Sequence, residues 1–139
     1  MEYLNLKIKR FVFFLLVSCG GAFSAQAQID SLKCNLVHTG TFAYRNDSLQ
    51  SILIVRKKNR QEEHNKATNT LTKYRVKWLS GCSYRLKQTW SNSRQQRKQN
   101  GSTSVVVINR ADKDGYQFTC RCENETDRAK YSGIVYRIE

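Results

Sequence analysis

Apolar and polar residues alternate in short runs from Thr39 to the end of the chain, and Gly, Asn and Asp residues separate the runs. An alternation with a period of two is typical of antiparallel β-strands that bury one face and expose the other. No convincing helical period of 3.6 residues competes with it. The pattern predicts about eight strands, at 39–44, 49–57, 61–66, 73–79, 82–90, 102–109, 116–122 and 134–138.

The connections between these runs are short, apart from the polar stretch 91–101. A sequential meander of hairpins closes most simply into an all-β, lipocalin-like up-and-down barrel, which also removes exposed strand edges. The alternative is a β-sandwich. We therefore expect one barrel-like domain over 39–139, preceded by an N-terminal segment at 28–38.

The parity of each run predicts which side chains point into the barrel. Large apolar residues dominate these inward faces, so they either fill the barrel or line a ligand cavity. The predicted inward residues are Tyr74, Val76 and Trp78; Cys82, Tyr84, Leu86 and Trp90; Tyr116, Phe118, Cys120 and Cys122; and Ile134, Tyr136 and Ile138.

The hairpin between 73–79 and 82–90 allows a finer prediction. Both apolar faces fall on even numbers, and cross-strand neighbours share a face, so parity excludes a two-residue loop. It predicts a three-residue loop, 79–81, with Gly81 at the position that favours glycine. The predicted register pairs Trp78 with Cys82, Val76 with Tyr84, Tyr74 with Leu86, Arg75 with Arg85, and Lys73 with Lys87.

Positive charge is the strongest compositional feature, with 24 Lys and Arg against 11 Asp and Glu, a net charge of +13. It favours anionic partners. One cationic stripe is predicted on the outer face of the same hairpin: Lys73, Arg75, Lys77, Arg85 and Lys87. Like charges opposite one another destabilise a sheet by about 0.2–1 kcal/mol per pair, which a bound anionic glycan or lipopolysaccharide relieves. In the alternative, solvent screens the repulsion.

Nucleic acid is a less suitable partner, because no aromatic residues interleave with these cations for base stacking. Further cations, including Arg56, Lys57 and Arg60, add charge in no recognisable pattern. The cationic stripe is therefore the one candidate polyanion-binding surface.

Residues 1–27 have the features of a signal peptide: a cationic stretch ending at Arg10, an apolar run at 11–17 and a final Ala25-Gln26-Ala27. This pattern predicts cleavage before Gln28. A competing reading takes Leu16-Val17-Ser18-Cys19 as a lipobox, with the protein anchored to a membrane through a lipidated Cys19. Both readings place the domain outside the cytoplasm, as a secreted or periplasmic protein or as a lipoprotein.

Four cysteines remain after residue 27. In an exported protein they can form disulfides, because the compartment outside the cytoplasm is oxidising. Cys120 and Cys122 are neighbours on one face of a strand, too far apart for a relaxed disulfide with each other. Cys34 with Cys82 is the first pairing to consider, and the other two are buried thiols unless one competes for Cys34 or Cys82. A zinc site is the alternative, although the C-x-C spacing does not favour it.

Hydrolytic catalysis needs a nucleophile with a base, or a pair of carboxylates in a cleft, and no such motif is recognisable. We therefore expect a non-enzymatic protein without a cofactor. His38 and His64 lie far apart in the sequence and are expected at the surface rather than on a metal. The runner-up is a small envelope enzyme or inhibitor, which requires Glu62, Glu63 or His64 in a cleft beside the 91–101 loop.

Two segments, Cys34 with His38-Thr39-Gly40-Thr41-Phe42-Ala43-Tyr44 and Trp78-Leu79-Ser80-Gly81-Cys82-Ser83-Tyr84, carry a resemblance. The chain resembles an uncharacterised family of small exported proteins from Bacteroidetes-type bacteria over roughly 34–86. Some members are labelled automatically as DNA topoisomerase IV, but an exported domain of this size has no room for a DNA gate or an ATPase partner. The resemblance implies a Cys34–Cys82 disulfide and a lipocalin-like meander, and Cys120 and Cys122 depart from its usual pattern.

These observations favour a non-enzymatic binding module of the envelope or the secreted space. Its ligand is either a small apolar molecule inside the barrel or a polyanion on the cationic stripe.

Overall fold

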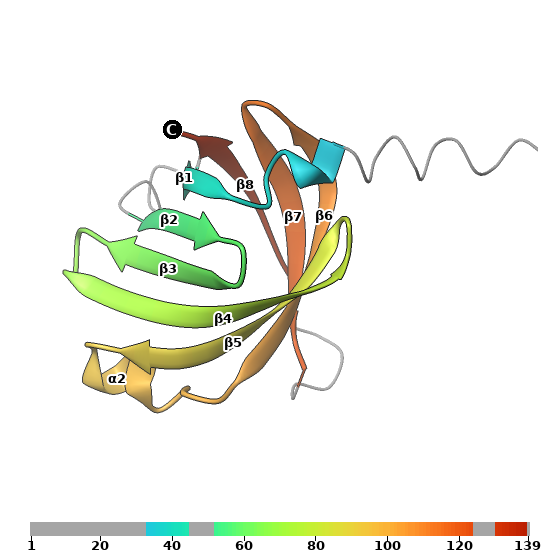
Figure 1. Ribbon diagram of the computed structural model, residues 1–139. Coiled ribbons are helices and arrows are strands. Elements are labelled where there is room, and N and C mark those ends of the chain that lie inside the picture. Colours follow the sequence, from blue (N-terminus) through green and yellow to red (C-terminus); the bar gives the residue numbers. More distant parts are fainter. Residues whose placement is uncertain (1–32, 45–51, 124–129, 139) are drawn as a thin grey trace, which may run out of the picture.

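The structure, a computed structural model, describes residues 33–44, 52–123 and 130–138 of the chain. Its strands follow one another around a closed barrel in sequence order, and each pairs antiparallel with its neighbours (Figure 1). The elements are β1 Gly40–Tyr44, β2 Ile52–Lys57, β3 Arg60–Asn65, β4 Thr70–Ser80, β5 Ser83–Ser91, the short helix α2 Arg94–Arg97, β6 Thr103–Asp112, β7 Gly115–Cys122 and β8 Lys130–Arg137. The prediction of an all-β, lipocalin-like up-and-down barrel is confirmed.

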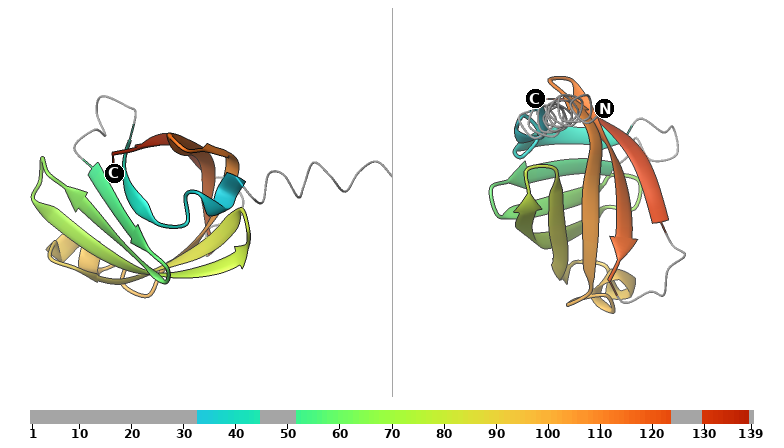
Figure 2. Two further views of the ribbon diagram at one scale, coloured as in Figure 1. Left: turned by 45° about the horizontal axis from the view of Figure 1, so that its top comes forward. Right: turned by 90° about the vertical axis from the view of Figure 1, so that its right-hand side faces the viewer.

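The barrel closes where β1 pairs with β8, and this closing ladder is the shortest that the described residues form. It consists of Phe42 with Arg137, Ala43 with Tyr136, and Tyr44 with Val135. The other seven ladders join strands that are consecutive in the sequence. The end-on view shows β1 and β8 side by side on the wall of the barrel (Figure 2). Closure therefore rests on a contact between the two ends of the domain.

The N-terminal segment 33–39 lies at one end of the barrel, beside the β4–β5 turn, and leads into β1 (Figure 2). Val37 is fully buried there. Cys34 and Cys82 form a disulfide with their Cα atoms 5.2 Å apart, which confirms the predicted pairing and ties this segment to the β4–β5 turn. His38 stacks on the ring of Trp78 at 3.5 Å between centroids and donates a hydrogen bond of 2.8 Å to the carbonyl of Gly81. We call this the capped end.

His38 is therefore half-buried in a stacked contact, and the expectation that it lies at the surface was wrong. The disulfide also removes Cys34 and Cys82 from any zinc site, and no group of three or more metal-ligating side chains occurs within the described ranges. Helices long and apolar enough to cross a membrane are likewise absent from the part of the chain that the structure describes.

The predicted register of the β4–β5 hairpin was wrong by two residues. Trp78 pairs with Tyr84 and Val76 with Leu86, while Ser80 and Ser83 flank a two-residue turn. A β-bulge between Trp78 and Ser80 absorbs one extra residue, Leu79, on β4. Because a bulge changes parity, it permits the short turn that a regular ladder forbids.

A second bulge on the same hairpin reverses the orientation of Trp90. Tyr74 pairs with Gln88 but Lys73 pairs with Trp90, so one residue of β5 is skipped between these pairs. Trp90 consequently points outward and is 43% exposed, contrary to the prediction, and the fully buried Ser91 takes the inward position. On the outer face, the Nζ of Lys73 lies 5.4 Å from the centroid of the Trp90 ring.

The predicted inward face of the last strand was also wrong. Val135 is buried beside Tyr116 in the β7–β8 ladder, whereas Ile134, Tyr136 and Ile138 are exposed. The neighbouring strand β7 holds to the prediction, since Tyr116 and Phe118 are buried. A glycine, Gly133, occupies another inward position of β8 because an added Cβ there would lie 2.8 Å from the ring of Phe118.

Candidate functional site

The barrel interior contains a buried arginine near the capped end. Arg56 of β2 is 2% exposed. Its Nε donates to Oε1 of Gln61 at 2.7 Å and its Nη1 to the carbonyl of Val37 at 3.1 Å. Its Nη2 donates to the hydroxyl of Tyr84 at 2.6 Å and to that of Tyr116. Side chains from β3, β5 and β7 and the N-terminal segment thus meet on a single guanidinium.

Aromatic rings also pack around the guanidinium group of Arg56. Its central carbon lies 4.5 Å from the ring centroid of Tyr84, 5.0 Å from that of Tyr116 and 5.6 Å from that of Phe42. Burial by itself acts to lower the pKa of Arg56, but Tyr84, Tyr116 and the nearby Glu63 outweigh it and raise that pKa above its ordinary value. Arg56 is therefore a permanent cation inside the barrel.

On the side of Arg56 away from the capped end, the barrel holds a cavity of about 330 Å³. Gln61, Tyr84 and Tyr116, which all accept hydrogen bonds from Arg56, belong to its wall. All eight strands contribute to its lining, which is mostly aromatic and aliphatic: Tyr44, Ile52, Ile54, Gln61, Glu63, Tyr74, Tyr84, Leu86, Ser104, Val106, Tyr116, Phe118, Cys120, Tyr131 and Ser132. A mostly apolar cavity with a few convergent polar groups has the composition of a small-molecule site.

Among the described residues of this lining, Glu63 of β3 is the one that carries a charge. Its Oε1 accepts a 2.8 Å hydrogen bond from Nε2 of Gln61, and its Oε2 accepts a long one, 3.4 Å, from the hydroxyl of Tyr74. Burial raises the pKa of Glu63, and the hydrogen bonds from Gln61 and Tyr74 together with the charge of Arg56 reverse only part of this rise. Gln61 is thus the link between the buried cation and the carboxyl group.

Two tyrosine hydroxyls lie near this carboxyl group. Burial, followed by the negative charge of Glu63, raises the pKa of both Tyr44 and Tyr74. Both hydroxyls therefore stay protonated at neutral pH and can donate or accept a hydrogen bond. The polar part of the cavity consists of one carboxyl group, an amide and neutral hydroxyls, surrounded by aromatic rings.

The connection that carries α2 is fastened to the inner side of β5. Gln88, which is buried, donates from Nε2 to the carbonyl of Gln96 at 2.6 Å and to Oδ1 of Asn100 at 3.1 Å. At the end of β5, the hydroxyl of Ser91 lies 3.2 Å from that of Thr72 on β4. These contacts make the 91–101 stretch part of the barrel wall, at the end opposite the cap (Figure 1).

Cys120 and Cys122 are free thiols, so neither competes with the Cys34–Cys82 pairing. Cys120 lines the cavity, and burial, followed by the neighbouring Cys122, raises its pKa. Cys122 accepts a weak hydrogen bond from the hydroxyl of Ser104 at 3.8 Å. A thiol with a raised pKa is mostly protonated and is a poor nucleophile, so Cys120 is a lining group rather than a reactive one.

The cationic stripe is assembled on the outer face of β4 and β5. The ladder places Lys77 opposite Arg85 and Arg75 opposite Lys87. These pairs show the same two-residue shift from the predicted register as the rest of the hairpin. Two of its five cations have acidic partners. The Nζ of Lys73 lies 3.7 Å from Glu62, and the Nε of Arg85 donates to Oε1 of Glu123 at 2.7 Å.

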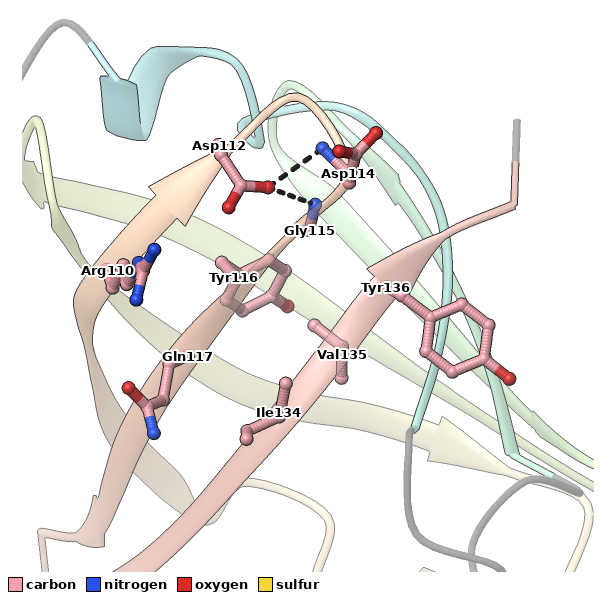
Figure 3. A pocket seen from close by; sticks show the side chains of 9 residues that line it. All are labelled: Arg110, Asp112, Asp114, Gly115, Tyr116, Gln117, Ile134, Val135 and Tyr136. Atoms are coloured by element: carbon pink, nitrogen blue, oxygen red, sulfur yellow. Dashed lines mark hydrogen bonds between the residues drawn. The ribbon is translucent and has the colours of Figure 1, made fainter.

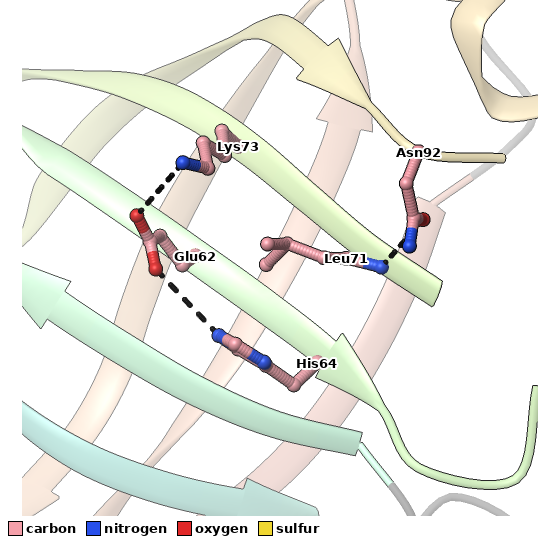
Figure 4. Close-up of polar contacts among 5 residues, drawn as sticks. All are labelled: Glu62, His64, Leu71, Lys73 and Asn92. Carbon is pink, nitrogen blue, oxygen red and sulfur yellow. Dashed lines mark hydrogen bonds and ion pairs between the residues drawn. The ribbon is translucent and has the colours of Figure 1, made fainter. Parts of the chain in front are cut away.

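The acidic and histidine residues of β3 do not form one cluster, because successive residues of a strand point to opposite faces. Glu62 lies on the outer face between Lys73 and His64, and its Oε2 is 3.6 Å from Nε2 of His64 (Figure 4). Glu63 points into the cavity. Asn92, in the 91–101 loop, accepts a hydrogen bond of 2.8 Å from the backbone of Leu71 on β4 (Figure 4). Glu62, Glu63 and His64 therefore do not share one cleft beside this loop.

A depression on the barrel surface beside the β6–β7 turn has a volume of about 590 Å³ and includes Asp112, Asp114 and Tyr136 (Figure 3). The carboxylate of Asp112 accepts hydrogen bonds from the backbone of Asp114 at 2.9 Å and of Gly115 at 3.1 Å. Asp112 thus stabilises the turn itself, as Asp commonly does. The depression lies on the outer surface and the hydrogen bonds of Asp112 serve the turn, so the barrel interior is the stronger candidate site.

Sequence reasoning missed Arg56 and Gln61 as site residues and considered Glu63 only for the runner-up, in a loop cleft. A signal was present for Arg56, which shares the even parity of Ile52 and Ile54. Charged residues at inward positions of a strand are rare unless they have partners, which makes this parity informative.

Comparisons with protein-family models, with curated proteins and with solved structures find no match to the chain. Its function is therefore argued from the site.

Proposed function

We propose that this protein is a non-enzymatic binding protein that holds one small, mostly apolar molecule inside its barrel. The observation that carries the proposal is the cavity of about 330 Å³ whose lining combines aromatic and aliphatic side chains with the carboxyl group of Glu63. Cavities that bind small molecules have volumes of about 300–1,000 Å³ and this kind of lining.

The wall of the cavity supports a preformed site. Tyr84, Val106 and Tyr116 are buried in the hydrophobic core and belong to the lining at the same time. The Arg56 hydrogen bonds hold both tyrosines in place before any ligand arrives. Preorganisation of this kind reduces the entropy that binding costs.

The size of the cavity limits the ligand. At about 30 Å³ per water, it has room for roughly ten waters, which a compact molecule with a short chain or one ring can displace. Burial of its apolar surface contributes about 25 cal/mol per Å² before the entropy of association is subtracted. A long lipid chain does not fit as a whole.

A homologous series of 1-alkanols, measured by calorimetry, tests the proposal. Affinity is expected to rise with chain length up to the limit set by the cavity and to change little with salt. Val106→Phe, which places a ring in the cavity, is expected to abolish binding. Val107→Phe makes the same change on the outer face of β6, where Val107 is exposed, and is expected to have no effect.

Denaturant unfolding of both variants shows whether each is folded, and Ser104→Leu offers a second, milder obstruction of the cavity. Binding that survives both obstructing variants, or no binding by any alcohol of the series, refutes the cavity as the site.

The cationic stripe supports a second candidate function, the binding of an anionic glycan or lipopolysaccharide. The supporting observation is that two like-charged pairs, Lys77 with Arg85 and Arg75 with Lys87, lie directly opposite one another. A polyanion reduces this repulsion. Retention on heparin that salt abolishes, and that weakens when Arg75 and Arg85 are changed to Ser, is the expected result; unchanged retention excludes the stripe.

Either function belongs outside the cytoplasm. The disulfide is compatible with an extracellular or periplasmic location, because thiols are kept reduced in the cytosol. Residues 1–27 and the lipobox cysteine, Cys19, lie outside the described residues, so secretion or a lipid anchor is part of the proposal. Peptide mapping of protein exported by its host distinguishes an N-terminus at Gln28 from a lipidated Cys19.

A further inference from the structure

The chain carries a net charge of +13, yet the one charged side chain that lines its cavity within the described ranges is an acid. The buried cation, Arg56, does not line the cavity. Its donors are directed at Gln61, Val37, Tyr84 and Tyr116. A ligand in the cavity therefore meets a carboxyl group directly and meets the guanidinium only through the side chains that cover it.

The carboxyl group also has room for another partner. A carboxylate offers about four lone-pair sites, and Glu63 uses one at 2.8 Å from Gln61 and one at 3.4 Å from Tyr74. The hydrogen bond from Tyr74 is at the weak end of the distance range. A ligand N–H group can therefore bind Glu63 without displacing a strong internal hydrogen bond.

Aromatic rings surround this acceptor. Tyr44, Tyr74, Tyr84, Tyr116 and Phe118 all belong to the lining. The faces of aromatic rings attract organic cations, by about 2 kcal/mol or more where water is excluded. A carboxylate within a group of aromatic rings has the chemistry that recognises an ammonium group.

We infer that the ligand is a small organic amine that binds as the ammonium ion, with its charged head on Glu63 and its apolar body against the aromatic wall. This inference rests on the proposed binding function and identifies the ligand class for the same cavity. An organic carboxylate is disfavoured, because it must approach Glu63 while Arg56 is covered by its own partners. A neutral alcohol can bind but lacks the charge-assisted hydrogen bond.

The protonation state of Glu63 adds a pH dependence. Because burial raises the pKa of Glu63, the empty protein holds this proton up to a higher pH than a free carboxyl group does, and an ammonium ion selects the ionised form. The ligand's affinity is therefore expected to increase as pH rises through the pKa of Glu63 in the empty protein. The increase ends at the higher pH where the amine loses its own proton.

Glu63 has titratable neighbours on several strands, and their effects are separable. Arg56 on β2 stays charged, and Tyr44 on β1, Tyr74 on β4 and Tyr84 on β5 have raised pKa values. On β7, Tyr116 supplies a hydroxyl and Cys120 has a raised pKa. Because Glu63 is the one carboxyl group among these neighbours, a rise in affinity that Glu63→Gln removes belongs to Glu63.

The experiment compares three probes of nearly equal size and shape: 3-phenylpropylamine, 3-phenylpropan-1-ol and 3-phenylpropanoate. Calorimetry at neutral pH and moderate salt is expected to show the amine binding about 10- to 100-fold more tightly than the alcohol, as expected for a charge-assisted hydrogen bond. The carboxylate is expected to bind weakest. The net positive surface repels the amine, so its advantage cannot come from non-specific attraction to the protein.

Glu63→Gln keeps the shape of the side chain and removes its charge. This variant is expected to lose the preference for the amine and its pH dependence but to keep the affinity for the alcohol. Glu62→Gln, on the adjacent residue of the same strand, changes a carboxylate on the outer face and is the matched control. It is expected to bind all three probes like the wild type.

The outcomes separate this inference from the function on which it rests. If the alcohol binds, if Val106→Phe abolishes that binding, and if the amine has no advantage or the carboxylate binds best, the amine inference is wrong and the binding function stands. If none of the probes binds, both fail. Should Glu63→Gln not fold, the wild-type comparison of the three probes and its pH profile still decide the question.

Discussion

The guanidinium of Arg56 lies 4.5 Å from the ring centroid of Tyr84 and donates a 2.6 Å hydrogen bond to the hydroxyl of the same residue's side chain. Because β2 and β5 are not adjacent strands, this contact crosses the barrel interior. It separates the tightly filled capped end from the cavity. The positive charge of Arg56 is therefore buried in the core rather than exposed at the surface.

Replacement of this charge by an apolar side chain of similar length, Arg56→Met, leaves the hydroxyls of Tyr84 and Tyr116 without their donor. We expect the free energy of unfolding, measured in urea, to fall by about 3 kcal/mol or more. Arg75→Met removes an exposed arginine and is expected to change it by about 0.5 kcal/mol at most. Equal stability of the wild type and Arg56→Met contradicts a structural role for the buried cation.

A second prediction concerns the contribution of the Cys34–Cys82 disulfide to stability. Cys34 and Cys82 are 48 residues apart, a loop for which the chain-entropy estimate is about 4 kcal/mol. The double variant Cys34→Ser/Cys82→Ser is expected to lose stability of this order, measured by denaturant unfolding. Changing the free thiols, Cys120→Ser or Cys122→Ser, is expected to have a much smaller effect.

The disulfide assignment itself is checked by alkylation of the denatured, unreduced protein. Among the four cysteines after residue 27, label on Cys120 and Cys122 alone is expected, and label on Cys34 or Cys82 contradicts the pairing.

The fold was largely predictable from the sequence because each strand keeps its own two-residue alternation. The errors occur where the alternation is broken. A bulge is a local insertion without a side-chain signature of its own, so neither the extra Leu79 nor the reversal at Trp90 was visible in the pattern. In β8 the outward face, with Ile134 and Tyr136, is more apolar than the inward face with Gly133, and the pattern therefore indicated the wrong side.

The pH dependence of stability provides a third prediction, with no ligand present. Burial raises the folded-state pKa of Glu63 above its ordinary value of 4.5, so the folded protein binds this proton more tightly than the unfolded chain. Stability contributed by Glu63 is therefore fully present at acidic pH and decreases as pH rises from about 4.5 through the folded-state pKa.

Thermal unfolding from pH 4 to pH 8 checks this direction. Relative to the wild type, Glu63→Gln is expected to become progressively more stable as pH rises, because it has no charge to bury. Glu62→Gln is expected to follow the wild type, and a Glu63→Gln curve that stays parallel to the wild type contradicts the raised pKa.

A fourth prediction concerns two glycines. An added Cβ at Gly115 would lie 2.1 Å from the backbone oxygen of Val135, so Gly115→Ala must separate β7 from β8 and is expected to cost about 3 kcal/mol or more. Gly101 has a φ of +92° but open space around it, so Gly101→Ala is expected to cost only about 1–2 kcal/mol. Similar losses in the two variants, measured by urea unfolding, contradict the close approach at Gly115.

The candidate site was less predictable than the fold, for a physical reason. The inward parity of Arg56 was readable from its own strand, but its neutralisation depends on Gln61, Tyr84 and Tyr116, which come from three other strands. These side chains come together because the barrel closes and its strands pair in a particular register. Neither feature can be deduced from the sequence of one strand. The cationic stripe, by contrast, lies within one hairpin and was predicted as a surface, with only its cross-strand pairs wrong.

In covalent terms, the oxidised chain is a closed ring from Cys34 to Cys82, carrying β1 to β4, followed by a free arm that carries β5 to β8. The arm pairs with the ring along the β4–β5 ladder and again, at its far end, through the three residue pairs between β1 and β8. Local opening is expected to start at this seam, since it has the fewest hydrogen-bonded pairs to break. Tyr44 belongs to both the seam and the cavity lining, so amide exchange in β1 and the escape rate of a bound molecule are two measurements of one breathing motion.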